Sequence, residues 1–221
     1  MQVDIWSDVV CPWCYVGKRR FEEALRRFPH AEAVSVRMHA FQLNPAAVPG
    51  DVTSRRAMLK SKYGLTDARV LELDAQMADV FRSVGLQFLG GEGQTGNTRV
   101  AHEVVAAGVD AGLQDAVVER LFRAYFTEGR SVFDPASLVE LGVEAGLDET
   151  SLRDALVNGT YAASVDADLD DARQNGVTGV PFFVFDRRLA LSGAQSPDVF
   201  MQALTQAWDT RLRPSGYGEA G

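Results

Sequence analysis

The chain has 221 residues, of which 46% are hydrophobic and 24% are charged, and its formal net charge at pH 7 is −8. This composition is typical of a soluble globular protein with one large or two small domains. The acidic balance argues against nucleic-acid binding, which needs a basic surface. No apolar run approaches the ~20 residues of a membrane span, so no membrane partner is expected.

The first stretch, Met1 to Trp6, has Val3 and Ile5 on one face and predicts the first core strand. It contains acids and no basic region, unlike a signal peptide, so we expect a cytoplasmic protein. Asp4 lies inside this strand, and two interpretations stay open. It is either a solvated acid at a strand end or a buried carboxylate that shuttles a proton to Cys14.

Both cysteines of the chain lie in one motif, Cys11-Pro12-Trp13-Cys14, between this strand and a helical stretch at residues 15–28. A C-x-x-C between a strand and a helix is typical of thioredoxin-like redox proteins. Pro12 suits the first helical turn, where a missing N–H costs nothing. Cys11 then lies at the helix N-terminus, where the macrodipole stabilises a thiolate. We therefore expect Cys11 to be the attacking nucleophile and Cys14 the resolving thiol.

Three other interpretations of the motif were weighed. A zinc site needs about four ligands, but no further cysteine exists and the three histidines are scattered, so no metal is expected. A static disulfide is rare in a cytosolic protein, and two inert buried thiols are the third alternative. Asp8, just before Cys11, is a candidate to orient Trp13, to cap the helix or to contact substrate.

Val34, Val36 and Met38 alternate with polar residues and predict a second strand. His39 lies on the polar face of that strand and is interpreted as a solvated or hydrogen-bonded histidine. A proline- and glycine-containing loop at residues 44–50 follows and is a candidate domain junction.

From Thr53 to about Asn158 the sequence shows no good strand pattern and predicts an all-helical insertion. The expected helices are 54–63, 67–84, 98–109, 114–126, 135–145 and 150–157. The glycine-rich loop 89–98 lacks the lysine of a phosphate-binding loop. It is either a connector in which Asn97 caps the next helix or a substrate-side loop that faces the thiols.

The C-terminal part predicts a helix at 160–175, an apolar strand at 182–185, a turn at Asp186-Arg187 and a return strand at 189–191. A last helix begins at Pro197, and a glycine-rich tail begins at Pro214. Pro181 opens the apolar strand, where a missing N–H is tolerated. Gly179 would give the backbone freedom before it.

Taken together, these motifs resemble the DsbA family of thioredoxin-fold oxidoreductases. The likeness is greatest to the FrnE-like branch, which is related to 2-hydroxychromene-2-carboxylate isomerases and kappa-class glutathione transferases. The matching stretches are Ser7 to Lys18, Phe41 to Pro45, Asn97 to His102, Gly179 to Phe185 and Ser192 to Gln195.

The resemblance implies an α/β thioredoxin-like fold with an all-helical domain inserted after the second strand. Residues 1–50 and 160–221 would form the thioredoxin-like domain, and residues 51–159 the helical insertion. It also implies that Pro181 is a cis-proline that packs against the disulfide, while a trans proline at a strand edge is the alternative. The backbone of Val180 would then pair with a bound peptide.

Two departures from the relatives bear on function. Some FrnE-like proteins carry a second cysteine pair, which this chain lacks, so schemes that need extra cysteines do not apply. The isomerase and transferase relatives have serine where this chain has Cys11. The retained cysteine favours thiol redox chemistry over glutathione-dependent isomerisation.

The sequence therefore predicts a cytoplasmic thiol–disulfide oxidoreductase that exchanges disulfides with protein or small-thiol substrates and needs no bound cofactor. One alternative is an isomerase or transferase that uses a low-molecular-weight thiol, such as glutathione, on a small aromatic or polyketide substrate. The Asn97 loop and Ser192 to Gln195 would then hold the thiol. A non-enzymatic alternative is a chaperone module that binds apolar clients.

Overall fold

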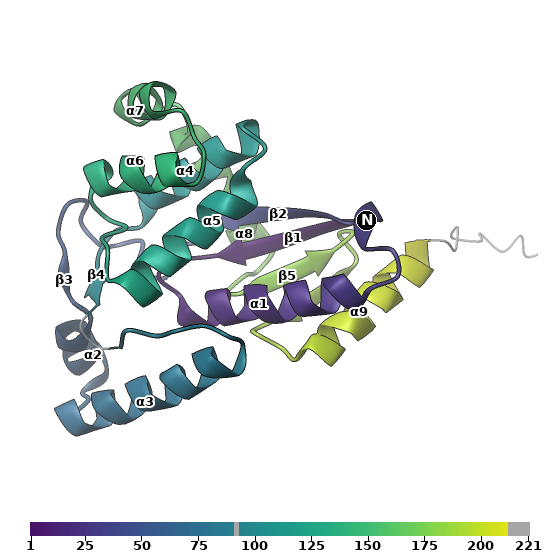
Figure 1. Ribbon diagram of the computed structural model, residues 1–221, viewed down its shortest axis with the longest axis horizontal. Coiled ribbons are helices and arrows are strands. Elements are labelled where there is room, and N and C mark those ends of the chain that lie inside the picture. The colour runs from purple at the N-terminus through teal and green to yellow at the C-terminus, as the bar shows by residue number, and fades with distance from the viewer. Residues whose placement is uncertain (91–92, 212–221) are drawn as a thin grey trace, which may run out of the picture.

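A four-stranded sheet lies at the centre of the computed structural model, which describes residues 1–90 and 93–211 (Figure 1). The strand order is β2-β1-β5-β6. The bounds are β1 Gln2–Ser7, β2 Ser35–Ala40, β5 Phe182–Phe185 and β6 Leu189–Ser192. β1 pairs in parallel with β2 and antiparallel with β5, and β5 pairs antiparallel with β6. The sheet thus joins strands from both ends of the chain, which confirms the α/β thioredoxin-like fold predicted from the sequence.

One face of the sheet is covered by α1 (Pro12–Arg27) and α9 (Pro197–Arg211), which lie side by side in Figure 1. Successive side chains of a strand point to opposite faces, so Val3 and Ile5 of β1 share this face, and both are buried in its apolar core. Phe21 of α1 packs there against Phe183 and Phe200. We call this side of the sheet the thiol face, because α1 carries both cysteines.

The opposite face is covered by α8 (Ala162–Gln174) and has a small apolar cluster of Trp6, Ala172 and Val177. We call it the α8 face. His39 lies here between two carboxylates: its Nε2 is 2.8 Å from Asp4 Oδ1 and its Nδ1 is 2.7 Å from Asp168 Oδ1. Its ring stacks on Trp6 with centroids 4.8 Å apart.

The charges of this cluster stabilise one another, with Asp4 buried and His39 and Asp168 half-buried. Burial alone would lower the pKa of His39, but the hydrogen bonds and charges of Asp168 and Asp4 outweigh it and raise that pKa to about 9. Burial acts to raise the pKa of Asp4, but the hydrogen bonds from His39 and Gln2 prevail and lower it. His39 is therefore protonated at neutral pH and ties α8 to the sheet.

These contacts correct two interpretations of the sequence. Asp4 is only 6% exposed, so it is not a solvated acid. It also does not serve Cys14, because it lies on the α8 face while Cys14 belongs to α1 on the thiol face. His39 is hydrogen-bonded, which is one of the two states left open for it by the sequence.

The segment between β2 and α8 is mainly helical, as predicted. Its helices are α2 Arg55–Tyr63, α3 Asp67–Ser83, α4 Arg99–Asp110, α5 Gln114–Arg123, α6 Pro135–Glu144 and α7 Glu149–Asn158. A 3₁₀ turn, η1 (Ala31–Ala33), precedes β2. Ser54, Thr66, Asp134 and Asp148 accept hydrogen bonds from first-turn N–H groups of α2, α3, α6 and α7. Such caps explain why the predicted starts of these helices are close to the observed ones.

Two details of this segment differ from the prediction. The two-residue strands β3 (Thr53–Ser54) and β4 (Gln94–Thr95) pair antiparallel, although no strand was expected there. They are too short to show a period of two in the sequence. The helix expected at 114–126 ends as an α-helix at Arg123 and continues as a π-helix, η2 (Ala124–Glu128).

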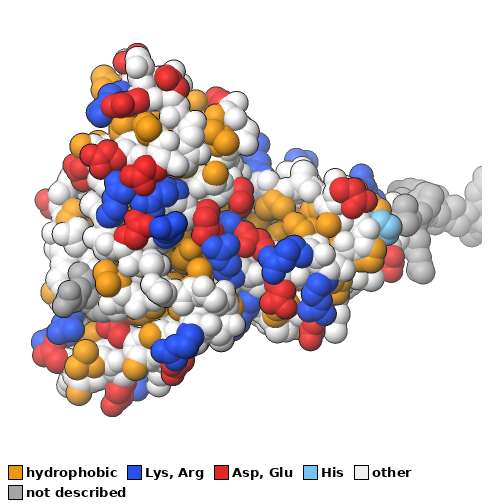
Figure 2. Space-filling model, in the orientation of Figure 1, with side chains coloured by type: hydrophobic (Ala, Val, Ile, Leu, Met, Phe, Trp, Pro, Cys, Tyr) orange, Lys and Arg blue, Asp and Glu red, His pale blue; other side chains and the backbone are white. Residues whose placement is uncertain are grey.

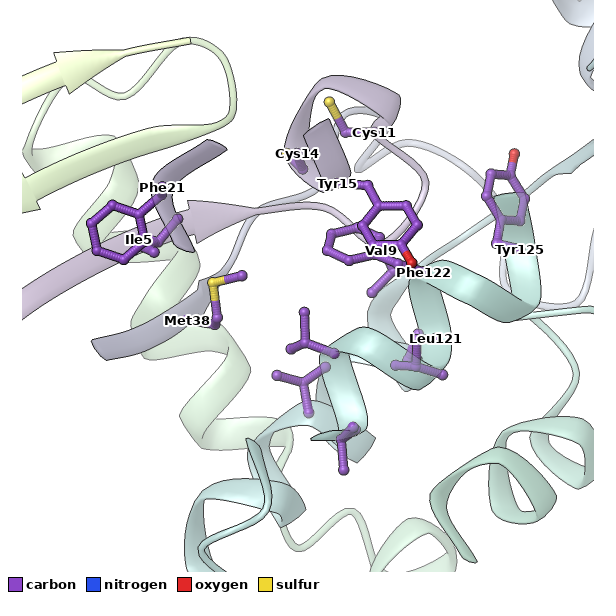
Figure 3. Close-up of a cluster of buried hydrophobic side chains, with 14 of the residues drawn as sticks. Ile5, Val9, Cys11, Cys14, Tyr15, Phe21, Met38, Leu121, Phe122 and Tyr125 are labelled. Carbon is purple, nitrogen blue, oxygen red and sulfur yellow. The ribbon is translucent and has the colours of Figure 1, made fainter. Parts of the chain in front are cut away.

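The apolar core runs without a break from the sheet into the helical segment. Tyr15 on α1 stacks on Phe122 of α5 with ring centroids 4.9 Å apart, and it also meets Phe81 and Phe126. Figure 3 shows Tyr15 and Phe122 side by side below the turn that holds the cysteines. The helix that carries the thiols is thus fixed by packing on both sides.

The free edge of β2 is closed by side chains. The Gln114 amide accepts from Met38 N at 3.0 Å and donates to Met38 O at 2.8 Å. Asp168 Oδ2 accepts from Ala40 N at 2.9 Å. Val36, which was expected on a buried face, is exposed instead.

The surface mixes both signs of charge (Figure 2). Over α5 and α6, Arg120 and Arg130 both pair with Glu144. Within the described part of the chain, no helix is long and apolar enough to cross a membrane.

Candidate functional site

The cysteine motif forms the start of α1. Cys11 is the N-cap residue, Pro12 occupies the first turn, and Cys14 N donates to Cys11 O at 3.0 Å. Both cysteines are free thiols, with exposed fractions of 4% for Cys11 and 2% for Cys14. Figure 3 shows them together in this first turn. Cys11 therefore lies where unpaired N–H groups and the helix dipole favour an anion, as the motif predicts.

The surroundings of Cys14 keep it protonated. Burial is the largest effect, and the hydrogen bond and charge of Cys11 add to it, so the pKa of Cys14 is raised well above its ordinary value. Hydrogen bonds from the Ser7 side chain and the Asp8 backbone act in the opposite direction. Ser7 was not singled out from the sequence, although its place at the end of the strand before the motif was a usable signal.

Val180 and Pro181 lie against the motif. The Cys11 thiol donates to Val180 O at a Sγ–O distance of 3.5 Å, and the Val180–Pro181 peptide bond is cis. The backbone of Val180 thus reaches the sulfur that is expected to react.

Gly17 allows α1 to approach this proline closely. A Cβ at Gly17 would lie 3.0 Å from Pro181 Cγ and 3.4 Å from Ala194 Cβ. Sequence analysis missed this residue. A glycine inside a helix costs roughly 0.5–1 kcal/mol relative to alanine, so its presence one turn after the motif was the available signal.

Gly179 and Gln195, expected at the substrate site, lie in the segments around Pro181. Gly179 does not have a positive φ, and a Cβ there would meet nothing within 4 Å, so neither its φ nor a close approach requires glycine at this position. The Gln195 amide donates to Ser192 O at 2.8 Å in an exposed loop, and it does not line the cavity beside the motif.

Asp8 is nearly inaccessible, with an exposed fraction of 1%. Its Oδ2 accepts from Leu43 N at 2.8 Å, and its Oδ1 accepts no hydrogen bond from any described residue. His102 Nε2 is 3.5 Å from Oδ1, but it bonds Phe41 O at 3.0 Å. The Asp8 side chain thus holds the loop after β2 and does not cap α1, which corrects one of the roles considered for it.

The side chain of Asn97 also makes its hydrogen bonds within the protein. Its Oδ1 accepts from Arg99 N at 2.8 Å and from Gln42 Nε2 at 3.1 Å. Its Nδ2 donates to Ala47 O at 2.6 Å. The N-cap residue of α4 is Thr98, however, so Asn97 stabilises the start of this helix from one residue before the expected cap position. Residues 91 and 92 of the loop lie outside the described residues.

A cavity of about 410 Å³ lies beside the motif, and Asp8, Val10, Pro12 and Trp13 supply one wall. Trp13 is 43% exposed at this wall. Other lining residues are Leu43, Asn44, Arg55, Met58, Leu59, Lys62, Tyr63, Thr95, Gly96 and Tyr125. A groove of about 480 Å³ on α9 is lined by residues of that helix alone, from Met201 to Thr210. Neither cysteine lines either hollow, but Pro12 and Trp13, which lie between the two cysteines, line the cavity at Trp13.

Known proteins with the same arrangement identify the family. The DSBA-like thioredoxin domain matches residues 2–205. The crystal structure of a probable DsbA oxidoreductase from Streptomyces coelicolor is 40% identical, covers 100% of this chain and 95% of its own, and superimposes with a TM-score of 0.92.

More distant relatives agree in extent and fold. The cytosolic disulfide reductase DsbM from Pseudomonas aeruginosa, solved with GSH, is 21% identical, with a TM-score of 0.64 over 96% of this chain and 100% of that one. The uncharacterized protein YwbO from Bacillus subtilis is 27% identical over 218 residues, which is 93% of this chain and 96% of YwbO. The chain therefore belongs to the DSBA-like thioredoxin domain family and is a disulfide oxidoreductase or isomerase of that family.

Proposed function

We propose that the protein works in the cytoplasm and exchanges disulfides through the Cys11–Cys14 pair, with thiol- or disulfide-bearing proteins and small thiols as substrates. The observation that carries this proposal is the placement of the two sulfurs. Cys11 begins α1 with its thiol at the Val180 carbonyl, and Cys14 lies buried one turn behind it.

The exchange proceeds in two balanced steps. The Cys11 thiolate attacks one sulfur of a substrate disulfide, a Cys11–substrate disulfide forms, and the other substrate sulfur leaves as a thiolate that takes a proton from solvent. Cys14 then loses its proton and attacks the Cys11 sulfur, which releases the second substrate thiol. The protein has given up two electrons and holds a Cys11–Cys14 disulfide. The same steps in reverse oxidise a dithiol.

The raised pKa of Cys14 divides the work between the two thiols. Because its surroundings keep Cys14 protonated, the sulfur that attacks first is Cys11. The Ser7 side chain and the Asp8 N–H, which both favour the Cys14 thiolate, assist its attack in the second step. An extended peptide that pairs with the Val180 backbone would bring its own sulfur to Cys11.

A small thiol as second substrate is favoured by the cavity at Trp13. Its volume of about 410 Å³ suits a small molecule. DsbM, which shares the fold, was solved with GSH. The isomerase or transferase alternative has less support, because the chain retains Cys11 where those relatives have serine.

The test is to trap the first intermediate. Cys14→Ser keeps the nucleophile but removes the resolving thiol, so the purified variant should accumulate mixed disulfides on Cys11 when mixed with cell extract or glutathione disulfide. A dithiol should release them, and mass spectrometry of the released thiols names the substrates. Cys11→Ser/Cys14→Ser is the control. A double variant that keeps wild-type activity would remove the redox proposal and favour a client-binding module.

A further inference from the structure

Helix α2 stands over the cavity without being buried itself. None of its residues is fully buried. Arg55, Met58, Leu59, Lys62 and Tyr63 line the cavity, and their steps of three and four residues place them on one face of the helix. That face is apolar in its middle and cationic toward both ends. In Figure 1, α2 lies at the end of the sheet where α1 begins.

The charge of α2 is opposite to that of the protein. The helix has the sequence RRAMLKSKY, with four cations and no acid, in a chain of net charge −8. Arg55 pairs with Asp74 (Nη1–Oδ1 2.7 Å), and Lys60 pairs with Asp67 (Nζ–Oδ2 2.7 Å). Lys62 has no ion-pair partner within residues 1–90 and 93–211, and its ammonium lies 5.6 Å from the Tyr63 ring centroid. Among the described residues, this cation at the cavity therefore has no carboxylate paired with it.

Asp8 is the acidic residue among those that line the cavity. Its Oδ2 is occupied by the Leu43 N–H, and its Oδ1 is shielded from solvent. The Asp8 carboxylate thus offers a ligand no exposed oxygen at Oδ1, whereas the ammonium of exposed Lys62 is accessible. A ligand with a carboxylate and an apolar link to its sulfur complements a wall of this kind.

We propose that α2 selects carboxylate-bearing small disulfides and thiols, with Lys62 as the residue that binds the carboxylate and Arg55 beside it. This inference rests on the proposed function and names the charge of its substrate. A small molecule is favoured because the cavity holds about 410 Å³, and because the net charge of −8 repels large acidic partners at long range. The reaction itself is the exchange described above, in which one disulfide takes two electrons from Cys11 and Cys14 and leaves as two thiols.

The test uses three small aliphatic disulfides: dithiodipropionate with two negative charges, hydroxyethyl disulfide with none, and cystamine with two positive charges. Each is mixed with the reduced full-length protein, and the second-order rate constant of protein oxidation is measured. In Lys62→Gln, the ratio of the rate constants for dithiodipropionate and hydroxyethyl disulfide should fall about twofold to fivefold, since one solvent-exposed charge contact is lost. In the same variant, the ratio of the rate constants for cystamine and hydroxyethyl disulfide should rise.

Lys60→Gln is the matched control. It removes the same charge from the same helix, but Lys60 pairs with Asp67 and does not line the cavity. Its ratios should equal those of the wild type. Equal falls in both variants, or no fall in Lys62→Gln, would overturn the inference. A Lys62 effect seen with an acidic peptide disulfide but not with dithiodipropionate would also overturn it, because α2 would then select a protein substrate.

Hydroxyethyl disulfide separates this inference from the function on which it rests. Failure of the wild type to react even with this neutral disulfide counts against the redox role of Cys11. If the wild type reacts with hydroxyethyl disulfide but the rate constants of the three disulfides do not depend on their charge, only the inference about α2 is contradicted.

Discussion

Aspartate–histidine contacts lie in two different parts of this molecule, and they are built differently. On the α8 face, His39 is bonded to Asp4 at 2.8 Å and to Asp168 at 2.7 Å, so both ring nitrogens are paired. Beneath the cysteine motif, His102 Nε2 is 3.5 Å from Asp8 and bonds a backbone carbonyl instead, and Asp8 Oδ1 stays without a hydrogen bond from the described residues. The first pair is complete and the second is not.

The complete contact stabilises the fold, whereas the incomplete contact lies next to the reactive thiols. A buried charge that is fully paired holds its neighbours in place, and removal of one partner costs about 3–5 kcal/mol. A buried acceptor that receives no hydrogen bond lowers the stability of the fold by about 1–3 kcal/mol, and by more if the group is charged. The acceptor left unpaired among the described residues, Asp8 Oδ1, lies next to the thiols, and the fully paired His39 lies on the α8 face of the same sheet. Stability and reactivity are thus assigned to opposite faces, and each assignment can be tested.

The largest effect is expected on activity. Cys11→Ser should reduce disulfide exchange to the uncatalysed background, because an oxygen in place of Sγ cannot form the mixed disulfide. The free energy of unfolding should change by only about 1 kcal/mol. Insulin reduction and urea unfolding measure the two quantities. Residual turnover well above background would show that the thiol face does not act through Cys11.

The opposite outcome is expected for the α8 face. His39→Gln leaves buried Asp4 and half-buried Asp168 without their cation, so the free energy of unfolding should fall by about 3 kcal/mol. Exchange activity per folded molecule should stay near that of the wild type. Parallel measurements of urea unfolding and small-disulfide exchange decide this. A proportional loss of activity in the folded variant would mean that the two faces are coupled.

A pH titration sharpens the same point without a mutation. The pKa of His39 is raised from 6.5 to about 9 on folding, so its stabilisation is fully present below pH 6.5 and is lost as the pH rises through about 9. The free energy of unfolding should therefore decline by an amount on the order of 3 kcal/mol over this window. His39→Gln should show a flatter profile. Equal slopes in both proteins would assign the pH dependence to other groups.

The smallest effect is expected at the incomplete pair. Asp8→Asn keeps an oxygen for the Leu43 N–H and removes a buried charge, so the free energy of unfolding should change by about 1 kcal/mol or less. Asp4→Asn, its counterpart on the α8 face, should cost more because His39 then loses one of its two carboxylates. The comparison fails if the two variants are equally destabilised in urea.

Local patterns in the sequence predicted much of this architecture. The strand, C-x-x-C and helix order placed Cys11 at the start of α1, and the capping side chains located most helices to within a few residues. Packing between distant segments could not be predicted in this way. Asp168 lies 129 residues from His39, and nothing near Asp4 or His39 in the sequence indicates that α8 supplies a carboxylate.

The candidate site divides in the same manner. Cys14, Val180 and Pro181 were predicted correctly as neighbours of Cys11, because motif spacing and the family resemblance both pointed to them. The wall formed by α2 was missed, since its relation to Trp13 depends on how the helical segment folds back over the motif. Gln195 and Asn97 were placed at the site by resemblance, but their side chains satisfy loop and helix-cap contacts.

The Gln114 amide at the edge of β2 has a consequence for self-association. An edge strand offers unpaired N–H and C=O groups, and these can recruit a strand from another chain and begin aggregation. Here one side chain imitates the peptide group of a neighbouring strand and occupies both backbone groups of Met38, while Asp168 takes the next outward N–H. The backbone groups of Met38 and the N–H of Ala40 therefore cannot pair with a strand of another chain.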